Sequence, residues 1–87
     1  MGRLEQVIDE IKELRNETTH KSALRVYNML EGNRKLFLER MEPDNFKYHL
    51  KSFEDLSEVS AKEYNTPGFK RDYNKSFEGL LFHLNRL

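Results

Sequence analysis

Apolar residues recur at intervals of three and four positions in four separate segments of the chain. This spacing places them on one side of a helix, because an α-helix turns once in about 3.6 residues. In the first segment, residues 4–14, charged and polar residues fill the positions between the apolar ones. The apolar stripe of this first predicted helix consists of Leu4, Val7, Ile8, Ile11 and Leu14.

A second helix is predicted over residues 21–41, with Thr18 or Thr19 as its N-cap, because a threonine hydroxyl accepts a hydrogen bond from a free amide of the first turn. Its stripe consists of Ala23, Tyr27, Leu30, Phe37 and Met41. Gly32 interrupts the segment, and we expect the helix to continue through it at a cost of about 1 kcal/mol, because the stripe stays in phase. The alternative is two shorter helices, the second of them capped at Asn33.

Prolines mark the starts of two further predicted helices. Pro43 ends the second helix, and Asp44 is placed to cap a third one. Thr66 followed by Pro67 is a favourable N-cap and first-turn pair for a fourth helix, because proline has no amide hydrogen to leave unpaired. The third stripe consists of Phe46, Leu50, Phe53, Leu56 and Tyr64, and the fourth of Phe69, Tyr73, Phe77, Leu80, Leu81, Leu84 and Leu87.

Four helices with short connections predict an all-α fold, a small antiparallel helical bundle of three to four helices. The 87 residues are expected to form a single helical domain, 1–87, because a chain of this length cannot bury two separate cores. The hydrophobic fraction of 37% predicts a thin core. Four tyrosines and six phenylalanines nevertheless supply large apolar surfaces, which argues against a disordered chain.

The sequence lacks the features of membrane proteins and of disulfide-stabilised proteins. Its longest apolar run is Leu80, Leu81 and Phe82, far short of the roughly 20 residues that span a bilayer. The N-terminal segment has no apolar stretch like that of a secretory signal, and the chain contains no cysteine. We therefore expect a cytoplasmic protein that does not associate with a membrane.

The sequence contains no recognisable catalytic or cofactor-binding motif. The chain has no cysteine nucleophile and no Gly-x-Ser-x-Gly motif. Its four glycines are too scattered to form a phosphate-binding loop, and a bundle of this size has little volume for an enclosed pocket. We therefore predict no enzymatic activity, no catalytic residue, no cofactor and no small-molecule substrate.

The histidines do not predict a metal site. Glu17 and His20 have the Glu-x-x-His spacing found in dinuclear metal proteins, but such sites need two of these motifs and two further carboxylates. His49 lies beside the third stripe and His83 beside the fourth, so both are predicted at the boundary of the core, where a ring edge contributes to packing.

An acidic row follows the first predicted helix. Glu5, Asp9 and Glu13 are four residues apart, and Glu17 continues the row. Like charges at this spacing cost an isolated helix about 0.2–0.5 kcal/mol per pair. The row is either a solvated face, relieved by Lys12 and by basic groups of neighbouring helices, or a docking surface for a basic partner.

Five apolar residues lie away from the stripes of their helices. Single exposed apolar residues are common, but five on three helices indicate an interface with another chain, unless oblique helix crossings bury them. The predicted partner-binding residues are Met29, Leu36 and Phe82, followed by Tyr48 and Val59, together with the acidic Glu5, Asp9 and Glu13.

By elimination, the sequence predicts a non-catalytic protein–protein interaction module. Such a module is a small helical regulator, adaptor or inhibitor that binds another protein or a second copy of itself. The alternative is a nucleic-acid-binding domain that uses basic residues of the second and fourth helices. The formal net charge of zero disfavours this alternative. Its candidate residues are Arg34, Lys35, Arg40, Lys70, Arg71 and Lys75.

Overall fold

The computed structural model describes residues 2–59 and 66–87, and within these ranges all regular structure is helical. The first segment forms α1 (Arg3–Glu13), which ends in a 3₁₀ turn, η1 (Leu14–Asn16). Next come α2 (His20–Gly32) and the short α3 (Arg34–Leu38). The chain ends with α4 (Pro43–Ser57) and α5 (Pro67–Leu84). The predicted all-α fold class is confirmed.

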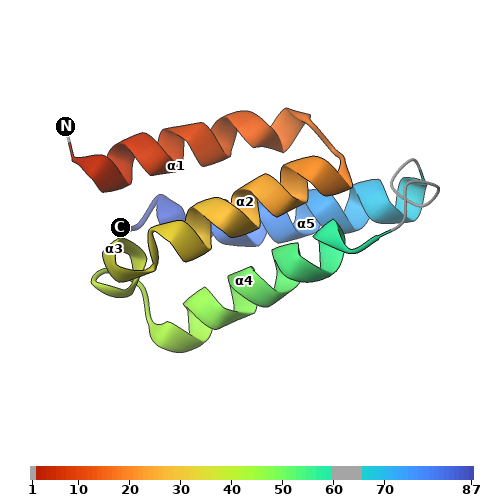
Figure 1. Cartoon of the computed structure of the whole chain (residues 1–87). Helices are drawn as coiled ribbons and strands as arrows, with labels where there is room; N and C mark the ends of the chain where they lie inside the picture. Colours follow the sequence, from red (N-terminus) through yellow and green to blue (C-terminus); the bar gives the residue numbers. More distant parts are fainter. Residues whose placement is uncertain (1, 60–65) are drawn as a thin grey trace.

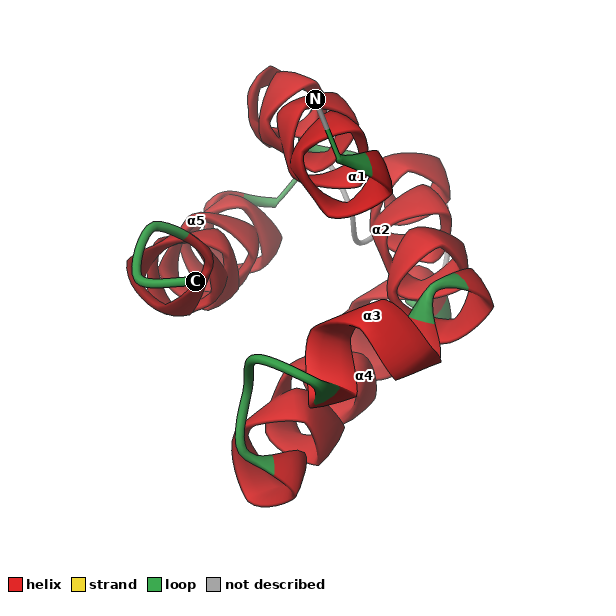
Figure 2. Cartoon of the chain, turned by 90° about the vertical axis from the view of Figure 1, so that its left-hand side faces the viewer, coloured by secondary structure: helices red, strands yellow, loops and turns green. Residues whose placement is uncertain are grey.

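The four long helices form an antiparallel bundle. Along the chain, α1, α2, α4 and α5 alternate in direction, and each lies beside the one before it (Figure 1). Viewed along their length, they surround a common centre in the order α1, α2, α4, α5, and α3 lies at the end where α2 passes to α4 (Figure 2). No helix among the described residues has the length and apolar character needed to cross a bilayer.

The predicted stripes form one core at the centre of the bundle. Phe53 of α4 packs edge-to-face on Phe77 of α5, with ring centroids 5.4 Å apart, and Tyr73 lies 5.3 Å from the same Phe77 ring. The stripe of α2 differs from the prediction at one position: Val26 is fully buried, whereas Tyr27 is only partly buried. The reason is the helical spacing, since Val26 lies three residues after Ala23 and four before Leu30.

Two threonine caps begin α2 and α5 as predicted. The Thr19 hydroxyl accepts a hydrogen bond from the Ser22 amide at 3.1 Å. The Thr66 hydroxyl accepts one from the Phe69 amide at 3.2 Å, and Pro67 occupies the first turn. Each cap satisfies an amide that has no partner inside its helix.

The prediction of one continuous helix over residues 21–41 is wrong, and the alternative of two helices is correct. The chain breaks at Asn33, whose side-chain amide donates to the Met29 carbonyl at 2.8 Å. That bond occupies the carbonyl that the Asn33 backbone amide would use in a continuous helix, and Gly32 beside it has a weak helix preference. The turn at this point redirects the chain so that both Phe37 and Met41 remain buried.

The third predicted helix begins earlier than expected. Asp44 is not its cap: the N-cap position is Glu42, without a side-chain hydrogen bond, and Pro43 occupies the first turn. Proline fits there because the first amides of a helix have no partner within it. Asp44 lies in the first turn, where its charge interacts favourably with the helix dipole. Tyr64, predicted for the stripe of this helix, lies outside the described residues.

Candidate functional site

Two histidines from different helices meet between α4 and α5. The Nε2 atom of His49 lies 2.6 Å from the Nδ1 atom of His83, so one ring nitrogen donates a hydrogen bond and the other accepts it. The two ring centroids are 4.9 Å apart. His49 is buried, with 2% of its surface exposed, whereas His83 is half-buried. The sequence placed both rings at the core boundary, but His49 is part of the interior.

The buried position of His49 favours its neutral form. Burial, and to a smaller extent the neighbouring His83, lowers the pKa of His49 to about 4. The hydrogen bond itself requires that at least one of the two facing nitrogens carries no proton. The pair is therefore a polar link between α4 and α5 that persists as long as one of these two nitrogens is unprotonated.

Two exposed aromatic side chains flank the histidine pair. Tyr48 is 68% exposed and Phe82 is 54% exposed. Each ring lies edge-on to the adjacent histidine, with centroids 5.6 Å apart for Tyr48 and His49 and 5.6 Å apart for Phe82 and His83. Four aromatic rings from two helices thus form a row across the α4–α5 junction. Both outer rings of this row were among the predicted partner-binding residues.

The exposed side of α5 beside this row has a repeating pattern. Four positions spaced by three and four residues fall within an arc of about 80°, at roughly 100° per residue: Asp72, Lys75, Gly79 and Phe82. Arg86 follows in the turn after the helix ends at Leu84. The guanidinium of Arg86 lies over the Phe82 ring, 4.0 Å from its centroid. We call these five residues together with Tyr48 the α4–α5 face.

The α4–α5 face contains a hollow one turn before Phe82. Its volume is about 250 Å³, and it is open to solvent. Tyr48 contributes one wall from α4, and Gly79 leaves room on the α5 side because it has no side chain. The hollow is lined by Tyr48, Asp72, Lys75, Ser76 and Gly79. It is thus bounded by an aromatic ring and by charged groups of both signs.

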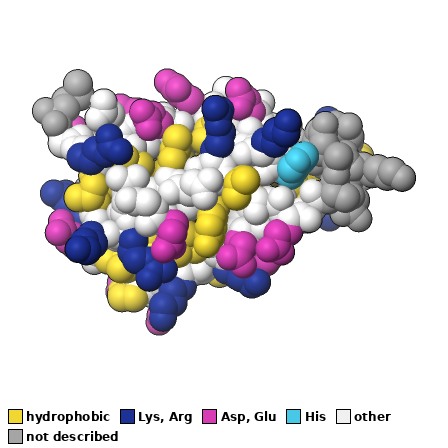
Figure 3. All heavy atoms as spheres, viewed as in Figure 1, with side chains coloured by type: hydrophobic (Ala, Val, Ile, Leu, Met, Phe, Trp, Pro, Cys, Tyr) yellow, Lys and Arg dark blue, Asp and Glu magenta, His cyan; other side chains and the backbone are white. Residues whose placement is uncertain are grey.

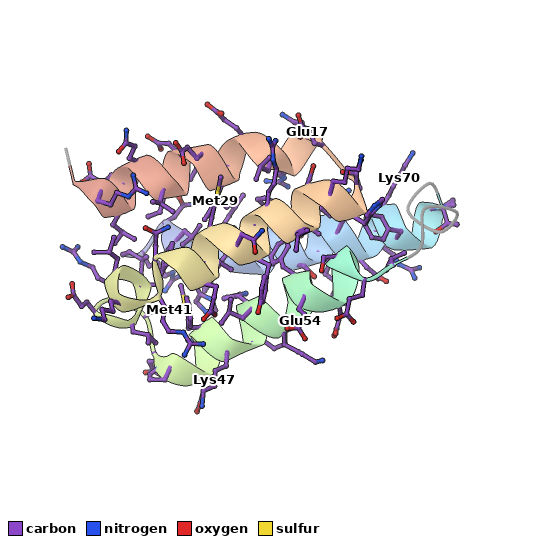
Figure 4. The ribbon with its side chains drawn as sticks, viewed as in Figure 1. Glu17, Met29, Met41, Lys47, Glu54 and Lys70 are labelled. Carbon is purple, nitrogen blue, oxygen red and sulfur yellow. The ribbon has the colours of Figure 1, made fainter. Side chains whose placement is uncertain are left out.

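The other three off-stripe residues do not join this face. Met29 lies between α1 and α2 and packs against the core (Figure 4). Leu36 is half-buried beside a hollow at the corner where α2 passes to α3. Val59 packs against the core after the end of α4, next to Phe69. Met29 and Val59 are therefore partly covered within the chain, Val59 because α4 ends at Ser57 and the helical spacing no longer applies to it.

The structure leaves the acidic row on the surface of α1. Glu5, Asp9 and Glu13 are exposed, and in the described part of the chain none of them forms an ion pair. Asp and Glu side chains line the edge of the molecule formed by α1 (Figure 3). Glu17 lies beyond the helix, where its carboxylate accepts a hydrogen bond from the Ser22 hydroxyl at 3.2 Å.

The predicted basic residues are spread along the bundle, with Lys75 at the middle of α5. Arg34 and Lys35 belong to α3, whereas Lys70 and Arg71 belong to the first turns of α5. These elements mark the two ends of the long axis, with Lys70 at the end away from α3 (Figure 4). Arg40 lies at the α3 end, beside Leu84. A single phosphate-binding track through all six residues is therefore not formed.

The remaining chemistry of the described residues is limited. No three of the histidine and carboxylate side chains in residues 2–59 and 66–87 gather as metal ligands.

The histidine pair was missed at the sequence level because its members lie 34 positions apart. One indication of this pair was present in the sequence: each histidine directly follows an off-stripe aromatic residue, Tyr48 before His49 and Phe82 before His83. Leu24, 46% exposed on α2, was also missed as an exposed apolar residue.

Comparison of the chain with protein-family models, with curated proteins and with solved structures finds no match.

Proposed function

We propose that this chain is a non-catalytic protein-binding module whose docking surface is the α4–α5 face. The observation that supports this proposal is the pair of exposed aromatic side chains, Tyr48 and Phe82, at the two ends of one row of rings. Aromatic residues are enriched at the energetic centres of protein interfaces. Fully burying a large apolar side chain contributes about 1.5–3 kcal/mol, so covering these two rings is a substantial source of affinity.

The polar groups of the face favour a protein partner over an apolar surface such as a lipid. Lys75 of α5 and Arg86 of the turn that follows it provide positive charge, and Asp72 of α5 provides negative charge, on the same face as Phe82. An aromatic centre with a mixed polar rim is the usual composition of a specific protein interface. The histidine pair beneath the rings holds α4 against α5, which keeps both walls of the face in place.

Nucleic-acid binding is the weaker alternative. Its basic residues are divided between α3 with the turn after it and α5, which do not form one track, and the rings nearest Lys70, Phe69 and Tyr73, are buried and unavailable for base stacking. Titration with labelled single-stranded and duplex oligonucleotides tests this alternative. Micromolar binding that weakens with salt would favour it over the protein-binding function.

The proposed function is tested by affinity capture with three versions of the protein. The bait is wild type, Phe82→Asp or Leu24→Asp, each in extract of the source organism. Leu24 is the matched control because it is also an exposed apolar residue on a helix, but on α2, outside the α4–α5 face. We expect proteins that are retained by wild type and by Leu24→Asp and lost with Phe82→Asp. Identical retention by all three baits would contradict the proposal.

A further inference from the structure

We propose that His49 and His83 bind a divalent late transition metal ion, Cu²⁺, Ni²⁺ or Zn²⁺, which joins α4 to α5 through the Nε2 atom of His49 and the Nδ1 atom of His83. These two nitrogens come from residues 34 positions apart and face each other at 2.6 Å. The imidazole nitrogen of histidine is the commonest protein ligand of such ions. This site does not depend on the proposed docking function of the α4–α5 face.

The separation of the two nitrogens is close to that of two ligands on one metal ion. Metal–nitrogen bonds of about 2.0–2.1 Å place two nitrogens about 2.9 Å apart at a right angle and about 3.3 Å apart in a tetrahedron. Starting from 2.6 Å, the rings therefore separate by only about 0.3–0.7 Å. Their planes are inclined at 62°, so the rings meet edge-on and are not stacked. Cu²⁺ and Ni²⁺ need the smaller movement, because they favour ligands at right angles.

One ligand of this site is fixed by packing and the other is adjustable. His49 is 2% exposed, and Gly79 lies opposite its ring, where even a methyl group would be 3.8 Å from Cε1. His83 is half-buried in the last turn of α5, so its ring moves the required distance without repacking the core. A ligand that packing already holds in place loses little conformational freedom on binding.

Metal binding requires that neither facing nitrogen carries a proton. In the hydrogen bond one of the two nitrogens carries it, and the metal ion takes its place. The ring that donated then holds its proton on its outer nitrogen, which is the other tautomer of neutral imidazole, so no proton is gained or lost overall. Water mediates this exchange, because His83 lines a hollow that is open to solvent.

The hollow beside His83 supplies the remaining coordination positions. It has a volume of about 160 Å³, and Glu42 and Asn45 line it together with His83. Asn45 lies four residues before His49 and Glu42 seven before it, so both are on the same side of α4 as His49. Among the described residues no carboxylate joins the two histidines as a third direct ligand. Water therefore completes the coordination, and the Glu42 carboxylate supplies negative charge nearby.

Two positively charged side chains limit the affinity of the site. Arg40 and Arg86 line the same hollow, and the Arg86 guanidinium lies 4.0 Å from the centroid of the Phe82 ring. Their charges oppose that of a metal ion. Only two protein atoms coordinate the ion directly, whereas structural metal sites have four protein ligands. We therefore expect a dissociation constant on the order of micromolar.

His20 is the matched control for the pair. It begins α2, in a different part of the bundle. Glu17, with which it shares the Glu-x-x-His spacing, accepts a hydrogen bond from the Ser22 hydroxyl at 3.2 Å. Replacing His20 removes one imidazole from the chain and leaves the facing nitrogens of the pair in place.

The site is tested by isothermal titration calorimetry on protein without a histidine tag. Wild type, His49→Asn, His83→Asn and His20→Asn are each titrated with Cu²⁺, Ni²⁺, Zn²⁺ and Mg²⁺. We expect wild type and His20→Asn to bind one late transition metal ion per chain, Cu²⁺ most tightly. His49→Asn and His83→Asn should bind about tenfold or more weakly, because one of two ligands is lost. Mg²⁺, which takes oxygen ligands, should not bind.

Two further measurements separate loss of a ligand from loss of the fold. His83 is half-buried, so the helical content of His83→Asn by circular dichroism is expected to match that of wild type. Electron paramagnetic resonance of the Cu²⁺ complex reports the coordinating imidazole nitrogens, and we expect two in wild type and one in His83→Asn. In wild type, a hundredfold excess of metal over the dissociation constant should raise the thermal midpoint by about 10 °C or more.

Three results would overturn the metal site. The first is the absence of binding of all three ions by wild type below millimolar concentration. The second is equal affinity in wild type and His83→Asn, which would place the ion elsewhere on the surface. The third is a complex of one ion with two chains in sedimentation, which would show that the ion bridges copies and not α4 and α5. None of these results alters capture through Phe82, so the metal site and the docking function fail separately.

Discussion

The hydroxyl of Tyr73 on α5 donates a buried hydrogen bond of 2.7 Å to the backbone carbonyl of Leu14, 59 residues earlier in the chain. Leu14 begins the 3₁₀ turn in which α1 ends. The bond therefore joins the first helix of the bundle to the last one through the core. Burial raises the pKa of Tyr73 to about 12, so the hydroxyl stays protonated and remains a donor over the ordinary pH range.

Replacing Tyr73 with phenylalanine is expected to destabilise the protein by about 1 kcal/mol, the usual net value of a hydrogen bond in a folded protein. The loss is limited because the Leu14 carbonyl also accepts a hydrogen bond from the Glu17 amide. The free energy of unfolding in urea measures the effect. Tyr27→Phe is the matched control, since Tyr27 is only partly buried, and we expect a change below about 0.5 kcal/mol there.

The histidine pair predicts a pH dependence of stability. In the unfolded chain His49 has its ordinary pKa of 6.5, whereas in the folded protein the pKa is lowered to about 4. Between these values the unfolded state binds a proton that the folded state excludes, so stability falls as the pH falls from 6.5 towards 4. The total loss from His49 is on the order of 2–3 kcal/mol.

Urea unfolding of wild type and of His49→Asn at pH 7, 6 and 5 measures this dependence. The variant cannot take up the proton, so its stability should change less with pH than that of wild type. The interval from pH 6.5 to 5 is the informative one, because carboxylates titrate mainly below it. Equal slopes for the two proteins in this interval would show that His49 does not exclude a proton on folding.

Gly79 offers a substitution that tests helix stability at the junction of α4 and α5. A methyl group there would lie 3.8 Å from Cε1 of His49, an ordinary contact, so Gly79→Ala fits the monomer without strain. We expect the fold to be stabilised by about 0.5–1 kcal/mol, because alanine favours a helix interior. The free energy of unfolding in urea measures the effect, and a loss of stability would show that the methyl group does not fit beside His49.

Neutralising the acidic row tests its role. Replacing Glu5, Asp9 and Glu13 with glutamine removes two like-charge contacts, each costing about 0.2–0.5 kcal/mol. Because these side chains form no ion pair in the described part of the chain, we expect the free energy of unfolding to stay constant or to rise slightly. Unchanged protein capture by this variant supports a solvated face, and loss of capture would assign the row to a docking surface.

Local sequence patterns predicted the helices and most of the core. The spacing of Val7, Ile11 and Leu14 or of Phe69, Tyr73 and Phe77 is enough to place these residues in the interior, because each helix must bury its apolar side. The caps at Thr19 and Thr66 were also predictable, since they depend on contacts three residues apart. Asn33 shows the limit of local patterns. Its side-chain amide competes with its backbone amide for the Met29 carbonyl, and the sequence was compatible both with one continuous helix and with two helices.

The surface relationships were decided only by the tertiary structure. Sequence periodicity assigns each side chain an angle around its own helix, but it does not say which helix lies beside that angle. Tyr48 and Phe82 belong to one face because α4 and α5 are neighbours, whereas Met29 and Val59, which looked equivalent in sequence, pack against the core. The contact between His49 and His83 likewise exists only because the bundle brings two distant helices together.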